Sequence, residues 1–176
     1  MTRPVALLLA ALALALAPAG AFAAERLGTP GADSLLGGTS PDQLYGEDGD
    51  DLLSGGAGAD VAYAGAGDDR LSGGAGRDVL FGQVGDDVLA GGVGNDRIYL
   101  GLGRDRADGG PGADTLTASG EGAVIRGGTG NDRIFARDGH RDEIDCGPGQ
   151  DLVQADRLDV LRGCERAVTS RLQHPA

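Results

Sequence analysis

The chain contains no tryptophan, only six other aromatic residues, two cysteines and two histidines among its 176 residues. Zinc, copper and iron sites draw on histidine and thiolate ligands, and His140, His174 and the two cysteines do not recur at a regular spacing. There is also no Gly-x-Ser-x-Gly and no His-Glu-x-x-His motif, two signatures of hydrolases. We therefore predict that the protein is not an enzyme.

Long hydrophobic runs are also missing. The longest, from Val5 to Ala17, is shorter than the ~20 residues that a membrane-spanning helix needs. It follows the positively charged start Met1-Thr2-Arg3 and precedes Ala21-Phe22-Ala23. This order is typical of a secretory signal peptide over residues 1–23, cleaved after Ala23. We expect a secreted, extracellular protein that does not insert into a membrane.

Basic residues are outnumbered by acidic ones. The formal net charge is −12, or −13 once Arg3 is removed with the signal peptide, and 22 of the 27 acidic residues are aspartate. Such a surface repels nucleic acid and anionic lipid, so we expect neither as a partner. With 34 glycines and few aromatics, the composition alone would also suit a disordered chain. An ordered fold therefore requires a regular pattern and a means of neutralising the aspartates.

That pattern is a nine-residue repeat. Twelve consecutive units run from Gly28 to Phe135 without insertion or deletion, each with a glycine-rich half followed by an x-hydrophobic-x half. The eighth position is aliphatic or alanine throughout: Leu35, Leu44, Leu53, Ala62, Leu71, Leu80, Leu89, Ile98, Ala107, Leu116, Ile125 and Ile134. The sixth position is aspartate in eleven units: Asp33, Asp42, Asp51, Asp60, Asp69, Asp78, Asp87, Asp96, Asp105, Asp114 and Asp132. The unit that begins at Ala118 has Ala123 instead.

The two halves of each unit predict a turn and a short strand. Glycine tolerates the positive φ of a tight turn, and the alternating half can pair as a strand. Because nine residues cannot bury a face alone, successive units should coil, two units to an 18-residue turn. We therefore predict an all-β protein, a parallel β-roll (β-solenoid) over residues 24–166. One domain suits the roughly 150 residues of the mature chain.

Coiling places aspartates 18 residues apart on one edge, spaced by the ~4.8 Å between neighbouring strands. Unneutralised, such a row of like charges is repulsive. A divalent cation between neighbouring loops would reverse this, since carboxylates and turn carbonyls are oxygen ligands. Calcium accepts six to eight such oxygens in flexible geometry, whereas magnesium prefers a tighter octahedron. We predict multiple Ca²⁺ sites, with the eleven sixth-position aspartates as candidate ligands.

The repeat resembles the Gly-Gly-x-Gly-x-Asp-x-hydrophobic-x nonapeptide of the RTX, or haemolysin-type, calcium-binding β-roll, over residues 28–154. Five units match its loop half in full: 55–60, 73–78, 91–96, 109–114 and 127–132. The resemblance implies that sixth-position aspartates of successive coils share a calcium ion with loop carbonyls. Many proteins of this family are large and carry a carboxy-terminal export signal. The amino-terminal signal expected here differs from that arrangement and disfavours a toxin, protease or lipase role.

The two edges of the predicted coil differ. All five full matches fall in even-numbered units, so the true period is 18 residues. Odd units vary in their opening pair, and three of them add an acid at the fifth position: Asp50, Asp68 and Asp86. We interpret the even edge as the more regular calcium row. The odd row is expected to end at Asp105, because the unit at Ala118 lacks the aspartate.

Every aromatic residue beyond the signal segment lies at the ninth position of an even unit: Tyr45, Tyr63, Phe81, Tyr99 and Phe135, with Thr117 between the last two. We favour a stacking ladder that stiffens the sheet. The alternative is an exposed strip that binds a carbohydrate or cell-surface partner.

The register changes at Ala136, where a cap is predicted to begin. Cys146 and Cys164 are 18 residues apart, the length of one coil, and a coil rise near 4.8 Å lies within the Cα separation that a disulfide tolerates. We predict a disulfide that closes the last coil, and a flexible tail over 167–176.

Two functions remain: a secreted calcium-binding structural module that folds on extracellular calcium, and a calcium-dependent adhesin or carbohydrate-binding module.

Overall fold

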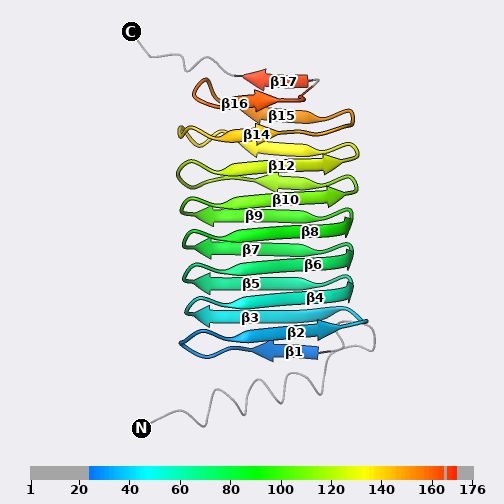
Figure 1. Cartoon of the computed structure of the whole chain (residues 1–176), viewed down its shortest axis with the longest axis vertical. Coiled ribbons are helices and arrows are strands. Elements are labelled where there is room, and N and C mark those ends of the chain that lie inside the picture. The colour runs from blue at the N-terminus through cyan, green and yellow to red at the C-terminus, as the bar shows by residue number, and fades with distance from the viewer. Residues whose placement is uncertain (1–23, 165, 170–176) are drawn as a thin grey trace.

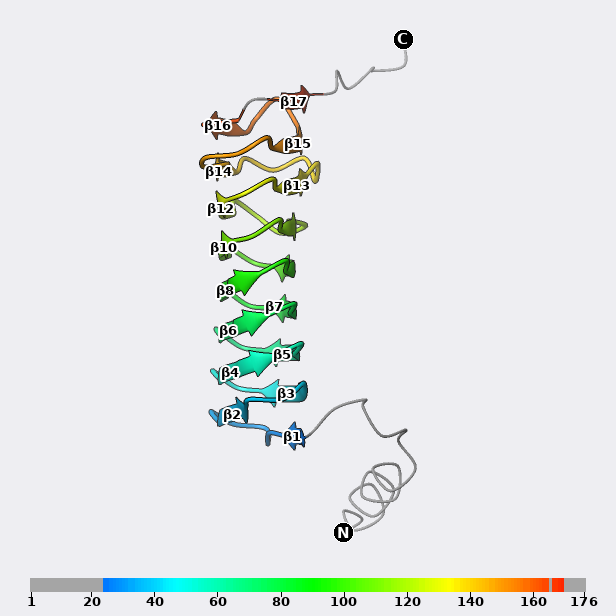
Figure 2. The same cartoon turned by 90° about the vertical axis from the view of Figure 1, so that its right-hand side faces the viewer.

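The computed structural model describes residues 24–164 and 166–169, which form a parallel β-solenoid of two facing sheets (Figures 1 and 2). Successive strands alternate between the sheets, so each strand pairs with the strand two places along the chain. The predicted all-β parallel β-roll is confirmed. The predicted signal peptide lies outside the described residues, as do residues 170–176.

One sheet has nine strands: β1 (Ala24–Leu27), β3 (Asp42–Asp48), β5 (Val61–Ala66), β7 (Val79–Val84), β9 (Arg97–Leu102), β11 (Thr115–Thr117), β13 (Arg133–Ala136), β15 (Leu152–Ala155) and β17 (Arg166–Thr169). The other has eight: β2 (Ser34–Gly38), β4 (Leu52–Gly58), β6 (Arg70–Gly76), β8 (Val88–Gly94), β10 (Arg106–Pro111), β12 (Val124–Thr129), β14 (Glu143–Asp145) and β16 (Val160–Arg162). Figure 2 shows the odd-numbered and even-numbered strands as two facing columns.

The 18-residue period is exact through the repeats. Leu44 pairs with Ala62, Ala62 with Leu80, and the offset holds to the pairing of Leu116 with Ile134. Beyond Ala136 the sheets continue, with offsets of 19 and then 17 residues on the β12, β14 and β16 side. The change of register at Ala136 is therefore a one-residue insertion inside the solenoid. Strand β17 covers 166–169, so the segment that the sequence treats as the tail begins within a strand.

Glycine is required where neighbouring coils touch. Gly76, at the fourth position of its unit, has a φ of +146°, and a Cβ there would lie 1.4 Å from the carbonyl oxygen of Gly58 in the preceding coil. Gly94 and Gly112 repeat this approach with the same 1.4 Å distance. A side chain at these positions would force the coils apart, which explains the glycine at the fourth position.

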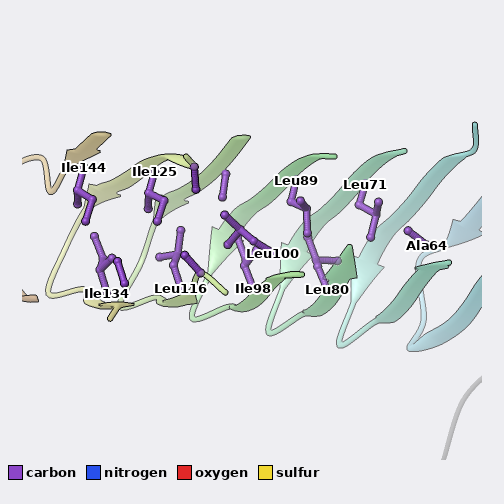
Figure 3. Close-up of a cluster of buried hydrophobic side chains, with 14 of the residues drawn as sticks. Ala64, Leu71, Leu80, Leu89, Ile98, Leu100, Leu116, Ile125, Ile134 and Ile144 are labelled. Carbon is purple, nitrogen blue, oxygen red and sulfur yellow. The ribbon is translucent and has the colours of Figure 1, made fainter. Parts of the chain in front are cut away.

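The core is a thin double row between the sheets (Figure 3). Eighth-position side chains from Leu44 to Ile134 are buried, as predicted, while Leu35 in the first coil is only partly covered. The first position of each unit also faces inward, so Leu100, Ala64 and Ala118 join the core. Leu100 stands where most units have glycine, and the repeat pattern did not predict its burial. Its inward position is set by the pleat of β9.

The predicted disulfide is confirmed. Cys146 and Cys164 are bonded across neighbouring coils, with their Cα atoms 5.1 Å apart. Cys146 is fully buried and occupies the first position of its unit, which is glycine in most of the repeats. The bond therefore links the last coils near the carboxy-terminal end of the solenoid.

The aromatic column forms a stacked ladder on the nine-stranded sheet. Ring centroids are 5.1 Å apart between Tyr45 and Tyr63, 4.7 Å between Tyr63 and Phe81, and 4.8 Å between Phe81 and Tyr99, with the planes within 6° of parallel. Phe135 is paired in register with Thr117 and Gln154, so neither flanking strand brings a ring beside it. The stacking interpretation is confirmed for four of the five aromatics.

We predict that Gly76→Ala destabilises the calcium-loaded protein by about 3 kcal/mol, because it adds backbone strain and forces two coils apart. The control is Gly31→Ala, since Gly31 has no atom within 4 Å of an added Cβ. Denaturant unfolding at fixed calcium measures both variants. Equal stabilities would contradict this account of the fourth-position glycine.

We predict that Phe81→Ala lowers the free energy of unfolding more than Phe135→Ala does, by about 1–3 kcal/mol. Phe81 loses two stacked neighbours, each ring pair contributing about 0.5–1.5 kcal/mol, whereas Phe135 has no ring on either flanking strand. Both side chains are half-buried, so the difference isolates the stacking contribution. Thermal unfolding of both variants gives the comparison, and identical losses would show that the ladder adds no stability.

Candidate metal centre

The sixth-position aspartates lie at the two edges of the solenoid, each just before or at the start of a strand. All except Asp33 are at most 3% exposed: Asp42, Asp51, Asp60, Asp69, Asp78, Asp87, Asp96, Asp105, Asp114 and Asp132. Asp33 is partly exposed in the first coil. The repeat therefore buries a carboxylate in ten of its twelve units, which is costly for an ionised group unless it is compensated.

One oxygen of each of these carboxylates except that of Asp33 accepts a backbone hydrogen bond from the neighbouring coil. The Asp60 N–H donates to Asp78 Oδ1 at 2.8 Å, and the Asp78 N–H donates to Asp96 Oδ1 at 2.9 Å. The other edge repeats this arrangement, as between the Asp69 N–H and Asp87 Oδ1 at 2.9 Å. The aspartates thus form two hydrogen-bonded ladders. The spacing of the repeat predicted that these aspartates stack, but not that one oxygen of each accepts a backbone N–H.

The other oxygen has no partner. Twelve buried Oδ2 atoms among the described residues accept no hydrogen bond: those of Asp51, Asp60, Asp69, Asp78, Asp87, Asp96, Asp105, Asp114, Asp132, Asp138, Asp142 and Asp151. Buried polar atoms are normally paired, so a column of unpaired oxygens indicates that a proton or a cation belongs beside them.

A further acceptor lies close to the unpaired oxygen in units that begin with glycine. A Cβ built on Gly55 would lie 2.4 Å from Asp60 Oδ2 and 2.7 Å from the Gly73 carbonyl oxygen of the next coil. Gly73 has the same surroundings, with Asp78 Oδ2 at 2.5 Å and the Gly91 oxygen at 2.6 Å. A carboxylate oxygen and a carbonyl oxygen therefore approach the same small space at the first glycine. This donor set suits a hard cation such as calcium.

Side chains alone do not complete such a site. Among the described residues, no three carboxylate, imidazole or thiolate groups are gathered in a geometry that could hold a metal ion. Each loop would contribute one carboxylate and would depend on main-chain oxygens for the remaining ligands. Calcium accepts carbonyl ligands of this kind, and zinc sites do not rely on them.

The surroundings raise the pKa values of the carboxyls. Burial raises the pKa of Asp87 to about 7, opposed by the hydrogen bond from the Asp69 N–H and reinforced by the charges of Asp105 and Asp69. Burial likewise raises the pKa of Asp114 to about 7 and that of Asp78 to about 6. Without a cation, these side chains would therefore hold protons close to neutral pH.

A second, exposed ladder follows the fifth position. The Asp68 N–H donates to Asp50 Oδ1 at 3.0 Å, and the Asp86 N–H donates to Asp68 Oδ1 at 2.9 Å. Asn95 accepts from Ala113 in the same way at 2.9 Å on the other edge. An amide therefore serves here as well as a carboxylate. These bonds run in the opposite direction to those of the sixth-position ladders.

Two further aspartates extend the sixth-position rows beyond the predicted set. The Ala123 N–H donates to Asp142 Oδ1 at 2.8 Å, and the Asp132 N–H donates to Asp151 Oδ1 at 2.9 Å. Both are buried and both have an unpaired Oδ2. One inserted residue before Asp142 hid this continuation. The hydrophobic residues two places on, Ile144 and Val153, were the signal that could have revealed it.

A profile of the RTX calcium-binding nonapeptide repeat matches the chain over residues 27–62, 54–89, 63–98, 81–116 and 117–153. These matches cover most of the chain, which therefore belongs to the RTX calcium-binding nonapeptide repeat family. The matched region is a repeat module, which is non-catalytic, and the match includes no catalytic domain. No curated protein shows significant sequence similarity to the chain. The described residues include no helix long and apolar enough to cross a membrane.

We predict that the calcium-free protein becomes more folded as the pH falls from 7.5 to about 4.5. The pKa values of Asp69 and Asp78 are raised to about 6 and those of Asp87 and Asp114 to about 7 in the fold, against an ordinary value of 3.8. The folded state therefore binds more protons than the unfolded one, and stability is lost as the pH rises through this window. Far-ultraviolet circular dichroism in chelator measures it. A folded fraction that falls on acidification would contradict the sign.

Proposed function

We propose that this is a secreted calcium-binding β-roll protein whose folding depends on Ca²⁺ bound between stacked glycine and aspartate loops. The observation that carries the proposal is the column of buried, unpaired Oδ2 atoms, which lie close to a carbonyl oxygen of the next coil where the unit begins with glycine. Membership of the calcium-binding repeat family supports the choice of ion. When bound, calcium supplies the positive charge that these oxygens lack.

The residues that would hold calcium are the eleven predicted sixth-position aspartates, together with Asp142 and Asp151. Except in Asp33, their Oδ1 atoms brace neighbouring coils through backbone N–H groups, and the unpaired Oδ2 atoms remain available to an ion. Because the paired loops come together only in the coiled chain, binding free energy would contribute to folding free energy. Extracellular calcium would then act as the folding signal, in keeping with the proposed export of the chain.

The alternative function, a calcium-dependent adhesin or carbohydrate-binding module, needs accessible aromatic faces. The faces of Tyr63 and Phe81 are covered by neighbouring rings at 4.7–5.1 Å. Sugar rings bind by stacking on such faces, so the column has little free stacking surface between its ends. The stacked geometry favours a structural role for the ladder, and a carbohydrate or cell-surface partner stays a prediction without a specific observation in its favour.

Asp78→Asn tests the proposal. Asparagine keeps an Oδ1 that can accept the Asp60 N–H, but it removes the charge at the unpaired Oδ2. We expect a lower calcium stoichiometry and at least a several-fold higher calcium midpoint for folding, because Asp78 is an interior member of the even row. Isothermal titration calorimetry and circular dichroism measure these quantities.

The matched control is Asp50→Asn. It removes the same charge from an exposed carboxylate whose Oδ1 also accepts a backbone N–H from the next coil, at 3.0 Å. We expect stoichiometry and midpoint to stay near those of the unaltered protein. Asp33→Asn at the end of the odd row should give an intermediate effect, since its Oδ2 already accepts bonds from Thr29. Equal shifts in all three variants would show that the aspartates act only as diffuse charge.

A further inference from the structure

The first residue of the repeat unit divides the sixth-position aspartates into two groups. Most units begin with glycine. Three nine-residue units with a sixth-position aspartate begin with a larger residue, and they join Ala64 to Asp69, Leu100 to Asp105 and Cys146 to Asp151. The carboxylates of the two groups are alike, because these three are also buried with an unpaired Oδ2. The groups therefore differ in the surroundings of that oxygen.

Glycine at the first position leaves open a space that two oxygens face. On the odd edge, a Cβ added to Gly82 would lie closer than 3.0 Å to both Asp87 Oδ2 and the Leu100 carbonyl oxygen of the next coil. Side chains essentially never place a Cβ that close to another atom. The carboxylate and the carbonyl can therefore approach this space together only where the first residue has no side chain.

Ala64 occupies the corresponding position one coil earlier. The register of β3, β5 and β7 sets it between Gly46 and Gly82, and Figure 3 shows it with the core side chains. It is completely buried, so its methyl group takes up the space that Gly82 leaves open in the next unit. Asp69 Oδ2 and the Gly82 carbonyl oxygen therefore cannot approach each other as the corresponding oxygens do beside Gly46 and Gly82.

Leu100 and Cys146 have the same effect in the units of Asp105 and Asp151. Leu100 is completely buried in the core, and Cys146 is completely buried and bonded to Cys164 of the next coil. In these units an apolar side chain or a disulfide holds neighbouring coils together. Glycine units instead bring two oxygens together at this place.

The larger first residues do not interrupt the column of carbonyl oxygens. A Cβ on Gly127 would lie 2.5 Å from the Cys146 carbonyl oxygen and 2.7 Å from Asp132 Oδ2. The carbonyl oxygens of Ala64 and Leu100 take the same place beside the glycine of the coil before them. Each larger residue therefore changes the site of its own unit and leaves the preceding site intact.

We propose that the first residue of each unit sets how strongly that unit binds calcium. Units that begin with glycine form the strong sites, and the weak sites are those of Asp69, Asp105 and Asp151. Calcium is held by six to eight oxygens at about 2.3–2.6 Å, so a loop whose carboxylate and carbonyl are kept apart offers the ion fewer ligands at once. The proposal rests on the proposed calcium-dependent folding, and it assigns different affinities to loops that carry the same aspartate.

Asp69→Asn and Asp87→Asn form a matched pair for the test, in the mature chain and with calcium alone as the probe. Both aspartates are 1% exposed, lie in adjacent coils of the odd row and accept a backbone N–H at Oδ1, at 2.7 Å and 2.9 Å. Their units begin with Ala64 and Gly82 respectively. We expect Asp87→Asn to lose one strongly bound ion and to raise the calcium midpoint of folding several-fold. Asp69→Asn should stay near the unaltered protein in both quantities.

Ala64→Gly tests the converse. Without the methyl group, Asp69 Oδ2 and the Gly82 carbonyl oxygen can approach each other, so equilibrium dialysis should show one more strongly bound calcium ion. The ion should be lost again when Asp69→Asn is added. The control is Ala62→Gly, which removes a buried methyl group from the same strand at the eighth position and should gain no ion.

Equal shifts in Asp69→Asn and Asp87→Asn would overturn the role of the first residue while leaving calcium binding by the repeats intact. A folded Ala64→Gly variant that binds no additional ion would do the same. Absence of calcium binding by the unaltered protein would instead overturn the proposed function and this inference together.

Discussion

The structure depends on how a buried carboxylate is compensated in each coil. An aspartate recurs at the sixth position, it is almost completely buried, and only one of its oxygens is paired within the chain. The backbone N–H of the preceding coil satisfies Oδ1 and thereby fixes the spacing between coils. The second oxygen requires either a proton or a cation. The same residue is therefore a structural brace and, in the proposed function, the source of calcium dependence.

The rest of the repeat follows from this requirement. A thin core, built from single leucine, isoleucine and alanine side chains, has little apolar area to offset the burial of charge. Glycine at the first position leaves space in which Asp60 Oδ2 and the Gly73 carbonyl approach each other, and glycine at the fourth lets Gly76 lie against Gly58. Backbone packing and carboxylate placement are thus two consequences of the same small residues. Outside the loops, the stacked rings and the disulfide add stiffness that does not depend on an ion.

Strict periodicity made most of the fold predictable from the sequence. The 18-residue coil, the inward eighth position, the stacking of the sixth-position aspartates and the Cys146–Cys164 bond all follow from spacing. The missed features fall where spacing changes or carries no information. One inserted residue left Asp142 and Asp151 out of the predicted ligands, and a substitution at a glycine position hid the inward Leu100. Which carboxylate oxygen accepts the backbone N–H and which stays unpaired depends on side-chain rotamers and strand stagger. Composition and period do not specify these.

The most direct measurement of the central claim is the far-ultraviolet circular dichroism of the mature chain, at neutral pH and with its disulfide intact, followed from excess chelator through a calcium titration. The account predicts a largely unfolded spectrum in chelator, because unpaired buried carboxylates destabilise the coil. It also predicts a cooperative rise of β-signal as calcium reaches the levels typical of extracellular modules, about 10⁻⁴–10⁻³ M. A full β-spectrum in chelator that calcium leaves unchanged would contradict it, because the solenoid would then be stable with its Oδ2 atoms uncompensated.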